Sequence, residues 1–217
     1  MQHLSFRRMQ RFAALPVICC LFLGIPAVYP QDAGTLKPIQ LPKPQTSGGK
    51  PLLTALSERK TTREFADKSL PVQTLSNLLW SAFGVNRGRD VKEGLGRTAP
   101  SAKNSQEVEL WVVLADGVYV YDAEANALRP QLAGDIRGKI GPPAAAKAPV
   151  TIAYVADVKY NYAQVDTGFI GQNVYLFAAS EGLNAWFHAF HGDDQIAPLG
   201  LPAEKHALYA QTVGYPR

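Results

Sequence analysis

The sequence predicts an α+β layered fold, because helical segments and hairpin strands occur without the regular strand-helix alternation of a parallel sheet. The clearest helical pattern runs over residues 74–84, where apolar residues recur three and four positions apart and a glycine ends the segment. The clearest strand pattern covers residues 107–122, with Asp116-Gly117 as the turn between two runs of β-branched and aromatic residues.

The first 27 residues are typical of a secretory signal peptide. An apolar stretch follows three cations, Arg7, Arg8 and Arg11. We therefore expect residues 1–27 to be removed and the protein to be exported, to a bacterial periplasm or the medium. A retained membrane anchor is disfavoured, because two prolines, Pro16 and Pro26, bracket an apolar run shorter than the ~20 residues of a spanning helix. A lipoprotein signal remains an alternative, because the leader contains Cys19 and Cys20.

Removal of the leader changes the charge balance. The leader holds three of the 22 Lys and Arg and none of the 18 Asp and Glu, so the net charge falls from +4 to +1. Nucleic acid and membrane surfaces are not expected as partners, since proteins that bind them carry a concentrated excess of Lys and Arg. Both cysteines also leave, so the mature chain has no disulfide, thiol nucleophile or cysteine metal ligand.

Two regions follow the leader. Residues 28–50 form a Pro-rich arm that favours an extended polyproline conformation. Residues 51–217 form one domain, and 47% hydrophobic residues in the chain are enough for a globular core. The domain opens with a helix that begins near Pro51 and places three leucines on one face, Leu52, Leu53 and Leu56.

The second half of the domain mixes helices and strands. We expect these elements in order: a short helix at 131–141, a buried strand at 149–157, a long helix at 164–183, a strand near 187–190, a short helix near 194–199 and a final strand near 207–217. The long helix is apolar on almost all sides, so we expect its own sheet on one side and a partner subunit on the other. One stripe is formed by Val165, Gly168, Phe169, Gln172, Tyr175, Leu176 and Ala179, and other faces carry Ile170, Val174 and Phe177. Gly168 and Gly171 would permit close approach of another element to this helix.

Residues 59–63 concentrate cations and hydroxyl groups within five positions: Arg59, Lys60, Thr61, Thr62 and Arg63. Guanidinium groups match the oxygens of a phosphate, and a threonine hydroxyl adds a neutral donor. A solvated basic face at the end of a helix is the alternative interpretation. The cluster predicts a site for a small anion.

Three stretches in order resemble one family, the nitroreductase-like FMN-dependent oxidoreductases. RKTTREF at 59–65 resembles the signature R-x-S/T-x-R/K-x-F, APSAKNSQ at 99–106 resembles P-S-x-x-N-x-Q, and DTGFIGQNVYLFAASEGLNA resembles the long central helix. The resemblance spans residues 41–217 and is strongest to a compact subgroup that includes dehydrogenases of thiazole- and oxazole-containing peptides. It implies a nitroreductase-like α+β fold, a mostly antiparallel central sheet flanked by helices, and an obligate homodimer built on the helix from Thr167 to Leu183.

The resemblance also implies FMN and the residues that hold it. Its phosphate and ribityl chain would lie at Arg59, Lys60, Thr61 and Arg63. The second subunit would contribute Pro100, Ser101, Ala102 and Asn104. A backbone amide at His188, Ala189 or Phe190 would face flavin N5, and Arg217 would replace basic residues that some members carry further on. No catalytic side chain is implied.

The histidines of this stretch allow other interpretations. A metal site of His188 and His191 with Asp193 and Asp194 is disfavoured, because two strand residues three positions apart point to opposite faces. His188 could also donate a proton near the flavin, although a buried, hydrogen-bonded histidine is the simpler interpretation.

The implied activity is transfer of hydride or electrons from a reduced donor such as NAD(P)H to a nitroaromatic, quinone or similar acceptor. Two alternatives remain: a dehydrogenase of a modified peptide or heterocycle, with Lys159, Tyr160 or Tyr162 as base, and a flavin-binding protein without turnover. The short connection at 158–164 predicts a substrate pocket that is open or closed by the arm.

Overall fold

The computed structural model describes residues 34, 36–90, 94–157 and 159–217, so the predicted leader lies outside the described residues. Within them, a seven-stranded sheet has the order β1-β6-β5-β4-β7-β9-β8, and all its pairings are antiparallel. Its strands are β1 (Ile39–Gln40), β4 (Glu109–Val113), β5 (Gly117–Asp122), β6 (Ala127–Ala133), β7 (Val150–Asp157), β8 (Asn184–His188) and β9 (Lys205–Gly214). The helices are α1 (Leu52–Glu58), α2 (Val72–Phe83), α3 (Ala163–Glu181) and α4 (Asp193–Ile196).

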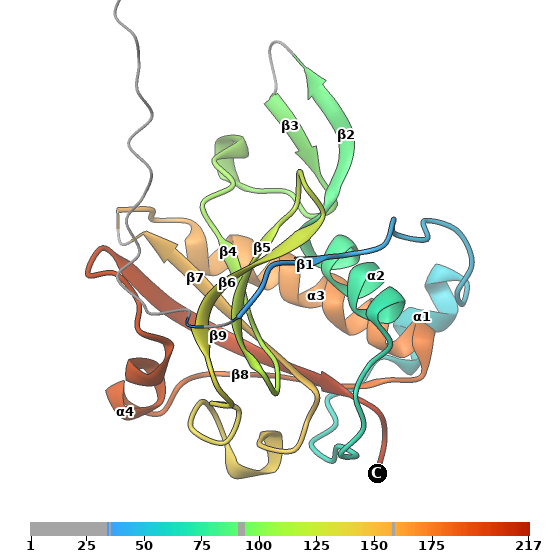
Figure 1. Cartoon of the computed structure of the whole chain (residues 1–217). Coiled ribbons are helices and arrows are strands. Elements are labelled where there is room, and N and C mark those ends of the chain that lie inside the picture. Colours follow the sequence, from blue (N-terminus) through green and yellow to red (C-terminus); the bar gives the residue numbers. More distant parts are fainter. Residues whose placement is uncertain (1–33, 35, 91–93, 158) are drawn as a thin grey trace, which may run out of the picture.

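Each face of this sheet carries its own hydrophobic core. Helices α2 and α3 cover one face (Figure 1), where Leu78, Ile152 and Val174 are fully buried. The 134–148 segment and the turn at Ala197–Leu199 supply the apolar side chains on the other face, which include Ile140 and Leu199. The observed architecture is therefore the predicted α+β arrangement, with an antiparallel sheet between two apolar layers.

Four of the predicted elements are confirmed. Helix α2 ends at Gly84, whose backbone amide donates to the Trp80 carbonyl. Strands β4 and β5 form the hairpin around Asp116-Gly117, and the final strand β9 pairs along the whole length of β7. Helix α3 ends at Gly182, which has a left-handed backbone with φ of 68°.

The prediction of a helix at 131–141 was wrong. Residues from Gln131 to Ala133 belong to β6, where Leu132 lies opposite Val118 of β5. The apolar residues Ile136 and Ile140 have the spacing of a helix. However, Gly134, with a φ of 100°, has a backbone conformation outside the helical range and separates strand β6 from these residues. Pairing with β5 therefore decided the structure of this segment.

A second hairpin was not predicted. Strands β2 (Val85–Asp90) and β3 (Gly94–Arg97) form their own two-stranded sheet. Figure 1 shows this hairpin projecting away from the main sheet. Its polar, glycine-containing sequence lacks the alternation of a half-buried strand, so no strand is predicted there from local pattern.

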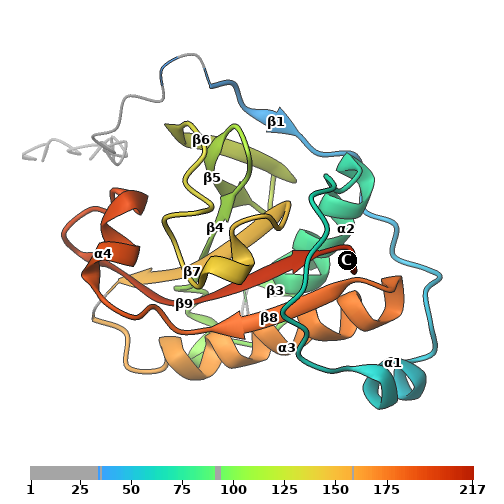
Figure 2. The ribbon, with the colours of Figure 1, turned by 90° about the horizontal axis from the view of Figure 1, so that it is seen from below.

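The described part of the arm lies against the domain in an extended conformation. Strand β1 pairs with β6, and the Ser76 hydroxyl of α2 donates to the Pro42 carbonyl. Further along, the Gln45 amide donates to Asn77 Oδ1 of α2, and the Lys50 amide donates to Ser180 Oγ of α3. Figure 2 shows the arm passing from β1 along α2 to α1. Among the described residues, no helix has the length and apolarity needed to cross a membrane.

The buried side of α3 differs from the expected stripe. Ile170, Val174 and Ala178 face the sheet, whereas Val165 and Phe169 of the predicted stripe are 56% and 45% exposed. Gly171 does permit close approach, since a Cβ there would lie 2.7 Å from the Phe187 ring, while Gly168 faces open space. Gly171 and Val174 are thus core positions of the protomer, and the exposed side of α3 is the one available to a partner.

Candidate functional site

The segment 59–65 follows α1 and runs along the open edge of β8. The Thr62 amide donates to the Ala185 carbonyl at 3.0 Å, and the Ala185 amide donates back to Thr62 Oγ1 at 3.1 Å. Asn184 of β8 donates from Nδ2 to the Glu64 carbonyl. Because β8 pairs only with β9 in the sheet order of the described strands, this segment covers an edge that would otherwise be unpaired.

The two arginines of this segment stack on different aromatic rings. Arg59 Cζ lies 5.2 Å from the centroid of the Tyr175 ring on α3, and Arg63 Cζ lies 5.1 Å from that of Trp186 on β8. Trp186 contacts His188 on the face of β8 opposite α3, because alternate strand residues point to opposite faces. Arg59 and Thr61 therefore gather at Tyr175, while Arg63 lies on the other side of the strand.

The cations of this segment keep their charge available. Lys60 and Arg63 are exposed, and among the described residues neither they nor Arg59 form an ion pair with a carboxylate. Lys60 and Thr62 line a hollow of about 240 Å³ at the end of α3, together with Pro216. Arg217, the predicted additional cation, follows Pro216 directly.

The second predicted group, residues 100–104, lies elsewhere. Its short 3₁₀ turn, Ala102–Asn104, is held from both sides: the Ala102 amide donates to Asp166 Oδ2 at 2.9 Å, and the Gln106 amide donates to Ser101 Oγ at 3.0 Å. Lys103 and Asn104 have left-handed backbones with φ of 56° and 53°. The loop is therefore fixed by hydrogen bonds in a conformation that few residues adopt without support.

A buried carboxyl pair lies beneath this loop. Asp166 and Glu107 are 1% and 7% exposed, and Glu107 Oε1 has no hydrogen-bond partner among the described residues. Burial raises the pKa of Asp166, the Ala102 amide opposes that rise, and the neighbouring Glu107 adds to it. A proton on Asp166 would give Glu107 Oε1 the donor that it lacks.

One protomer does not bring the two groups together. Asp166, which holds the loop, and Tyr175, which contacts Thr61, are nine residues apart on α3, or about 14 Å and two and a half turns. They project from opposite sides of the helix. The loop instead lines a hollow of about 580 Å³ with the β2–β3 hairpin, which includes Arg87.

The end of β8 carries the predicted flavin-facing amides. The His188 imidazole is buried, and its Nε2 lies 3.1 Å from Thr212 Oγ1 of β9. Burial lowers the pKa of His188 from 6.5 to about 4, so the ring is neutral at pH 7. This side chain is the buried, hydrogen-bonded histidine of the simpler interpretation. Among the described residues, no three His, Cys, Asp or Glu side chains form a group that could hold a metal ion.

The residues considered as a base precede α3. Tyr160 and Tyr162 are 38% and 54% exposed. Lys159 Nζ lies 2.9 Å from Asp157 Oδ2, and this hydrogen-bonded ion pair raises the pKa of Lys159. The ion pair favours the charged form of Lys159, in which the lysine cannot accept a proton.

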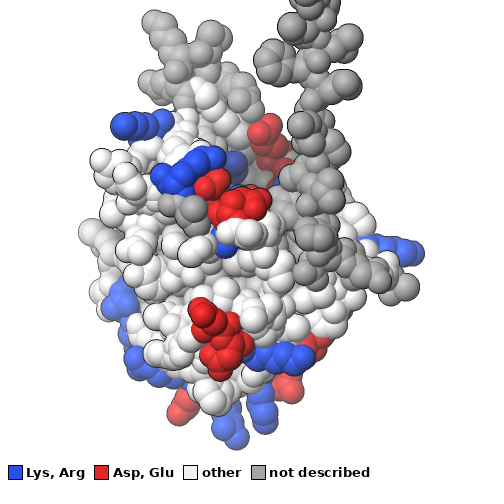
Figure 3. Space-filling model, turned by 90° about the vertical axis from the view of Figure 1, so that its left-hand side faces the viewer, with Lys and Arg blue, Asp and Glu red and all other residues white. Residues whose placement is uncertain are grey.

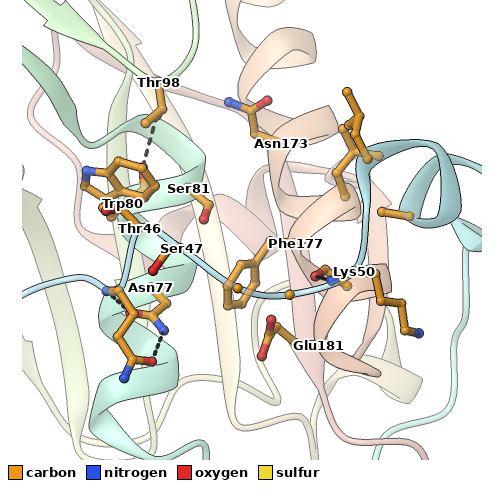
Figure 4. Close-up of a pocket in the computed structure, with 17 residues that line it drawn as sticks. Thr46, Ser47, Lys50, Asn77, Trp80, Ser81, Thr98, Asn173, Phe177 and Glu181 are labelled. Carbon is orange, nitrogen blue, oxygen red and sulfur yellow. Dashed lines mark hydrogen bonds between the residues drawn. The ribbon is translucent and has the colours of Figure 1, made fainter.

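The arm covers another hollow, between α2 and α3. Figure 4 shows Thr46 and Ser47 of the arm beside Asn77 and Trp80 of α2, with Phe177 of α3 opposite. The hollow measures about 460 Å³, and Lys50 lines both this hollow and the one beside Lys60. In the protomer, the arm therefore closes part of the face on which α2 and α3 meet.

Sequence reasoning missed three contact residues of the site: Asp166, Tyr175 and Trp186. Tyr175 was assigned only to the apolar stripe of α3, and no local pattern marks a helix residue that contacts a segment 114 positions away. Asp166 had a weak signal, since a carboxylate within an apolar helix usually has a bonding partner.

On the face shown in Figure 3, Lys and Arg are interspersed with Asp and Glu among uncharged residues.

The fold and the site define an α+β protein with a cationic segment at an open sheet edge and a separate, rigid loop at the far end of its central helix. The chain belongs to the nitroreductase family, whose model matches residues 56–215. This match confirms the family expected from the sequence, and the protein is therefore an oxidoreductase of that family.

Individual relatives agree with this assignment. A Methanocaldococcus jannaschii protein with a provisional nitroreductase name is 27% identical over 180 residues, which are 73% of this chain and 88% of that protein. A crystal structure from Ralstonia eutropha, also provisionally named a nitroreductase, has a TM-score of 0.74 and 31% identity, and the match covers 85% of this chain and 92% of the other. The Escherichia coli microcin synthetase McbBCD complex shares the fold, with a TM-score of 0.61, 20% identity and coverage of 81% and 77%.

Proposed function

We propose that this protein is an exported, homodimeric, FMN-dependent oxidoreductase. It passes hydride or electrons from a reduced donor such as NAD(P)H to a nitroaromatic, quinone or similar acceptor. The observation that carries the proposal is the cationic segment at the edge of β8, where Arg59 and Lys60 keep uncompensated charge next to the Thr61 hydroxyl.

The residues present fit a phosphate-bearing cofactor. Arg59 offers a planar fork of donors, Lys60 a point charge and Thr61 a neutral hydroxyl, which together complement a phosphate dianion. Arg217 would add a cation from the end of the chain. FMN, when bound, supplies the two-electron chemistry, and the protein holds the cofactor and shapes the space around it.

Other residues would act on the flavin ring. Ser101 and Asn104 would reach the ribityl chain and ring edge from the second subunit, and an amide of His188 or Ala189 would face the ring from β8. The neutral His188 side chain points into the protomer core and holds the end of the strand through Thr212. Its role in this proposal is structural support, and no side chain of this chain is assigned as acid or base.

Exposed apolar surface supports the dimer. Three leucines of α1, Leu52, Leu53 and Leu56, are 62%, 78% and 44% exposed, and Phe169 and Val165 of α3 are also exposed. Only Ala55 of α1 is buried within the protomer. Large exposed apolar side chains on two helices are typical of a protein interface. A second subunit would cover them and bring residues 100–104 to the cationic segment of its partner.

Bound cofactor in freshly purified protein tests the proposal directly. We expect a yellow protein with about one FMN per subunit, bleached by a reduced donor and reoxidised by a nitroaromatic or quinone. Extraction and chromatography identify the flavin, and light scattering gives the mass of the particle. A protein that purifies without flavin and does not bind added FMN would overturn the proposal.

The export part has its own test. The leader carries the pair Arg7-Arg8, but Gln10 stands where a twin-arginine signal usually has a large apolar residue, so we propose the general secretory route. Replacing both arginines by lysine should leave export unchanged, as measured by fractionation and processing of the leader. Loss of export in that variant would favour the twin-arginine route, and an uncleaved cytoplasmic protein would refute both.

A peptide dehydrogenase is the alternative, supported by the fold shared with the microcin synthetase complex. That reaction requires a base as hydride leaves, and Tyr160, Tyr162 or Lys159 would have to serve; of these, Lys159 forms an ion pair with Asp157 that favours its charged form. Oxidation of an azoline-containing peptide, lost in the double variant Tyr160→Phe, Tyr162→Phe, would select this alternative.

A further inference from the structure

Tyr175 joins the cationic segment to β8 through a single hydroxyl group. The Phe187 amide of β8 donates to Tyr175 Oη at 2.8 Å, and Tyr175 Oη lies 2.9 Å from Thr61 Oγ1. The ring of the same tyrosine lies under the guanidinium group of Arg59. One side chain of α3 therefore contacts two residues of the predicted phosphate site and the strand that carries the predicted flavin-facing amides.

The direction of these hydrogen bonds follows from the chemistry of the groups. A backbone amide can only donate, so Tyr175 Oη accepts from Phe187. A phosphate dianion can only accept, so Thr61 must donate its hydroxyl hydrogen when an anion lies beside it. Thr61 Oγ1 then accepts from Tyr175, and the three bonds run in one sense, from the Phe187 amide through Tyr175 and Thr61 to the anion. Such chains polarise one another and strengthen each bond.

We propose that Tyr175 is a positioning residue for the anionic end of the cofactor. Its hydroxyl fixes Thr61 as a donor towards the phosphate, and its ring holds Arg59 beside Thr61. This inference rests on the proposed function, since it assigns the phosphate of FMN to the Arg59–Thr61 side of the segment. Tyr175 itself need not touch the phosphate.

The test compares FMN with riboflavin, which has the same ring but no phosphate. Tyr175→Phe keeps the ring and removes only the hydroxyl. We expect the Kd for FMN to rise about 3- to 10-fold, the range for loss of one hydrogen bond, and the Kd for riboflavin to stay within a factor of two. Fluorescence titration of the deflavinated protein measures both constants.

Two further variants separate positioning from general damage. Thr61→Val removes the hydroxyl through which Tyr175 is proposed to act, so the double variant Tyr175→Phe, Thr61→Val should bind FMN no more weakly than Thr61→Val alone. Tyr121→Phe, on β5 four strands away from β8 in the sheet order, removes a tyrosine hydroxyl that donates to Asn126, and it should bind both flavins as the wild type does.

Each other outcome overturns the inference. Equal losses for FMN and riboflavin would show a merely structural role of Tyr175, and additive losses in the double variant would show that it acts independently of Thr61. Unchanged FMN affinity in Tyr175→Phe would overturn the inference alone. A wild-type protein that binds neither flavin would overturn the proposed function, and this inference would fall with it.

Discussion

The two ends of α3 support the candidate site in different ways. Near its C-terminal end, the segment around Arg59 is exposed and cationic, and ring stacking and a few hydrogen bonds hold it against β8. Near its N-terminal end, the loop around Ala102 sits above the buried Asp166 and has left-handed backbone residues. The first region offers charge and the second offers a fixed shape. An anion's affinity should therefore depend on the first region, and the placement of a ring on the second.

The largest expected effect comes from breaking the proposed dimer, because in that dimer the cationic segment of one subunit meets the loop at residues 100–104 of the other. Phe169→Glu puts a charge on the exposed apolar side of α3, and burying it unpaired in an interface would cost several kcal/mol. We expect a monomer that has lost flavin, as seen by light scattering and absorbance. The control Ala203→Glu adds the same charge on an exposed loop and should stay dimeric. A Phe169→Glu monomer that still holds FMN would show that one protomer forms the whole site.

Loss of charge in the first region should come next. The double variant Arg59→Ala, Arg63→Ala should weaken FMN binding by on the order of 1.5 to 3 kcal/mol, the contribution of a charge-assisted hydrogen bond. The matched control Arg129→Ala, Lys147→Ala removes the same charge elsewhere on the surface. If titration gives wild-type affinity in the first variant, the segment is a solvated basic face. The single variants Arg59→Ala and Arg63→Ala show which arginine contributes, because the two side chains lie on opposite faces of β8.

Removing Asp166, which holds the loop around Ala102, should lower the free energy of unfolding. Asp166→Ala leaves the half-buried Ala102 amide without its acceptor, which should cost about 1 to 3 kcal/mol in urea unfolding. Asp166→Asn keeps an acceptor for that amide and should cost much less. A similar loss in both variants would contradict the hydrogen-bonding role of Asp166.

The same residue gives a pH dependence. Folding raises the pKa of Asp166 above its usual value of 3.8. Between these two pKa values, the folded state therefore binds more protons than the unfolded state. Its contribution to stability is therefore complete below pH 3.8 and is lost as the pH rises through the folded pKa. Unfolding free energies measured across this range should fall less steeply in Asp166→Asn than in the wild type. An unchanged slope would mean that Asp166 does not carry the extra proton.

The smallest effect is expected within the loop. Lys103 has a φ of 56°, which glycine adopts readily, so Lys103→Gly should change stability by less than about 1 kcal/mol and leave FMN affinity unchanged. Lys103→Val should cost about 1 to 2 kcal/mol, since a β-branched residue is strained there. Thermal unfolding measures both. Weaker FMN binding in Lys103→Gly would give the lysine side chain a role in the site.

The sequence by itself determined the features that depend on neighbours along the chain. Apolar spacing specified α2 and α3, the Asp116-Gly117 turn specified the β4–β5 hairpin, and the order of three short motifs specified the nitroreductase family. Each helix pattern, turn and motif is local, because it is complete within about 20 residues, and only the order of the three motifs extends over a longer part of the chain.

Only the tertiary structure decided where these pieces meet. It made Gln131–Ala133 a strand through pairing with β5, and it sent Arg59 and Arg63 to opposite sides of β8. It also chose Tyr175 and Asp166, two and a half turns apart on one helix, to hold segments far away in sequence. The physical reason is that each of these contacts joins residues separated by more than ten positions, so its free energy depends on packing that no local pattern contains.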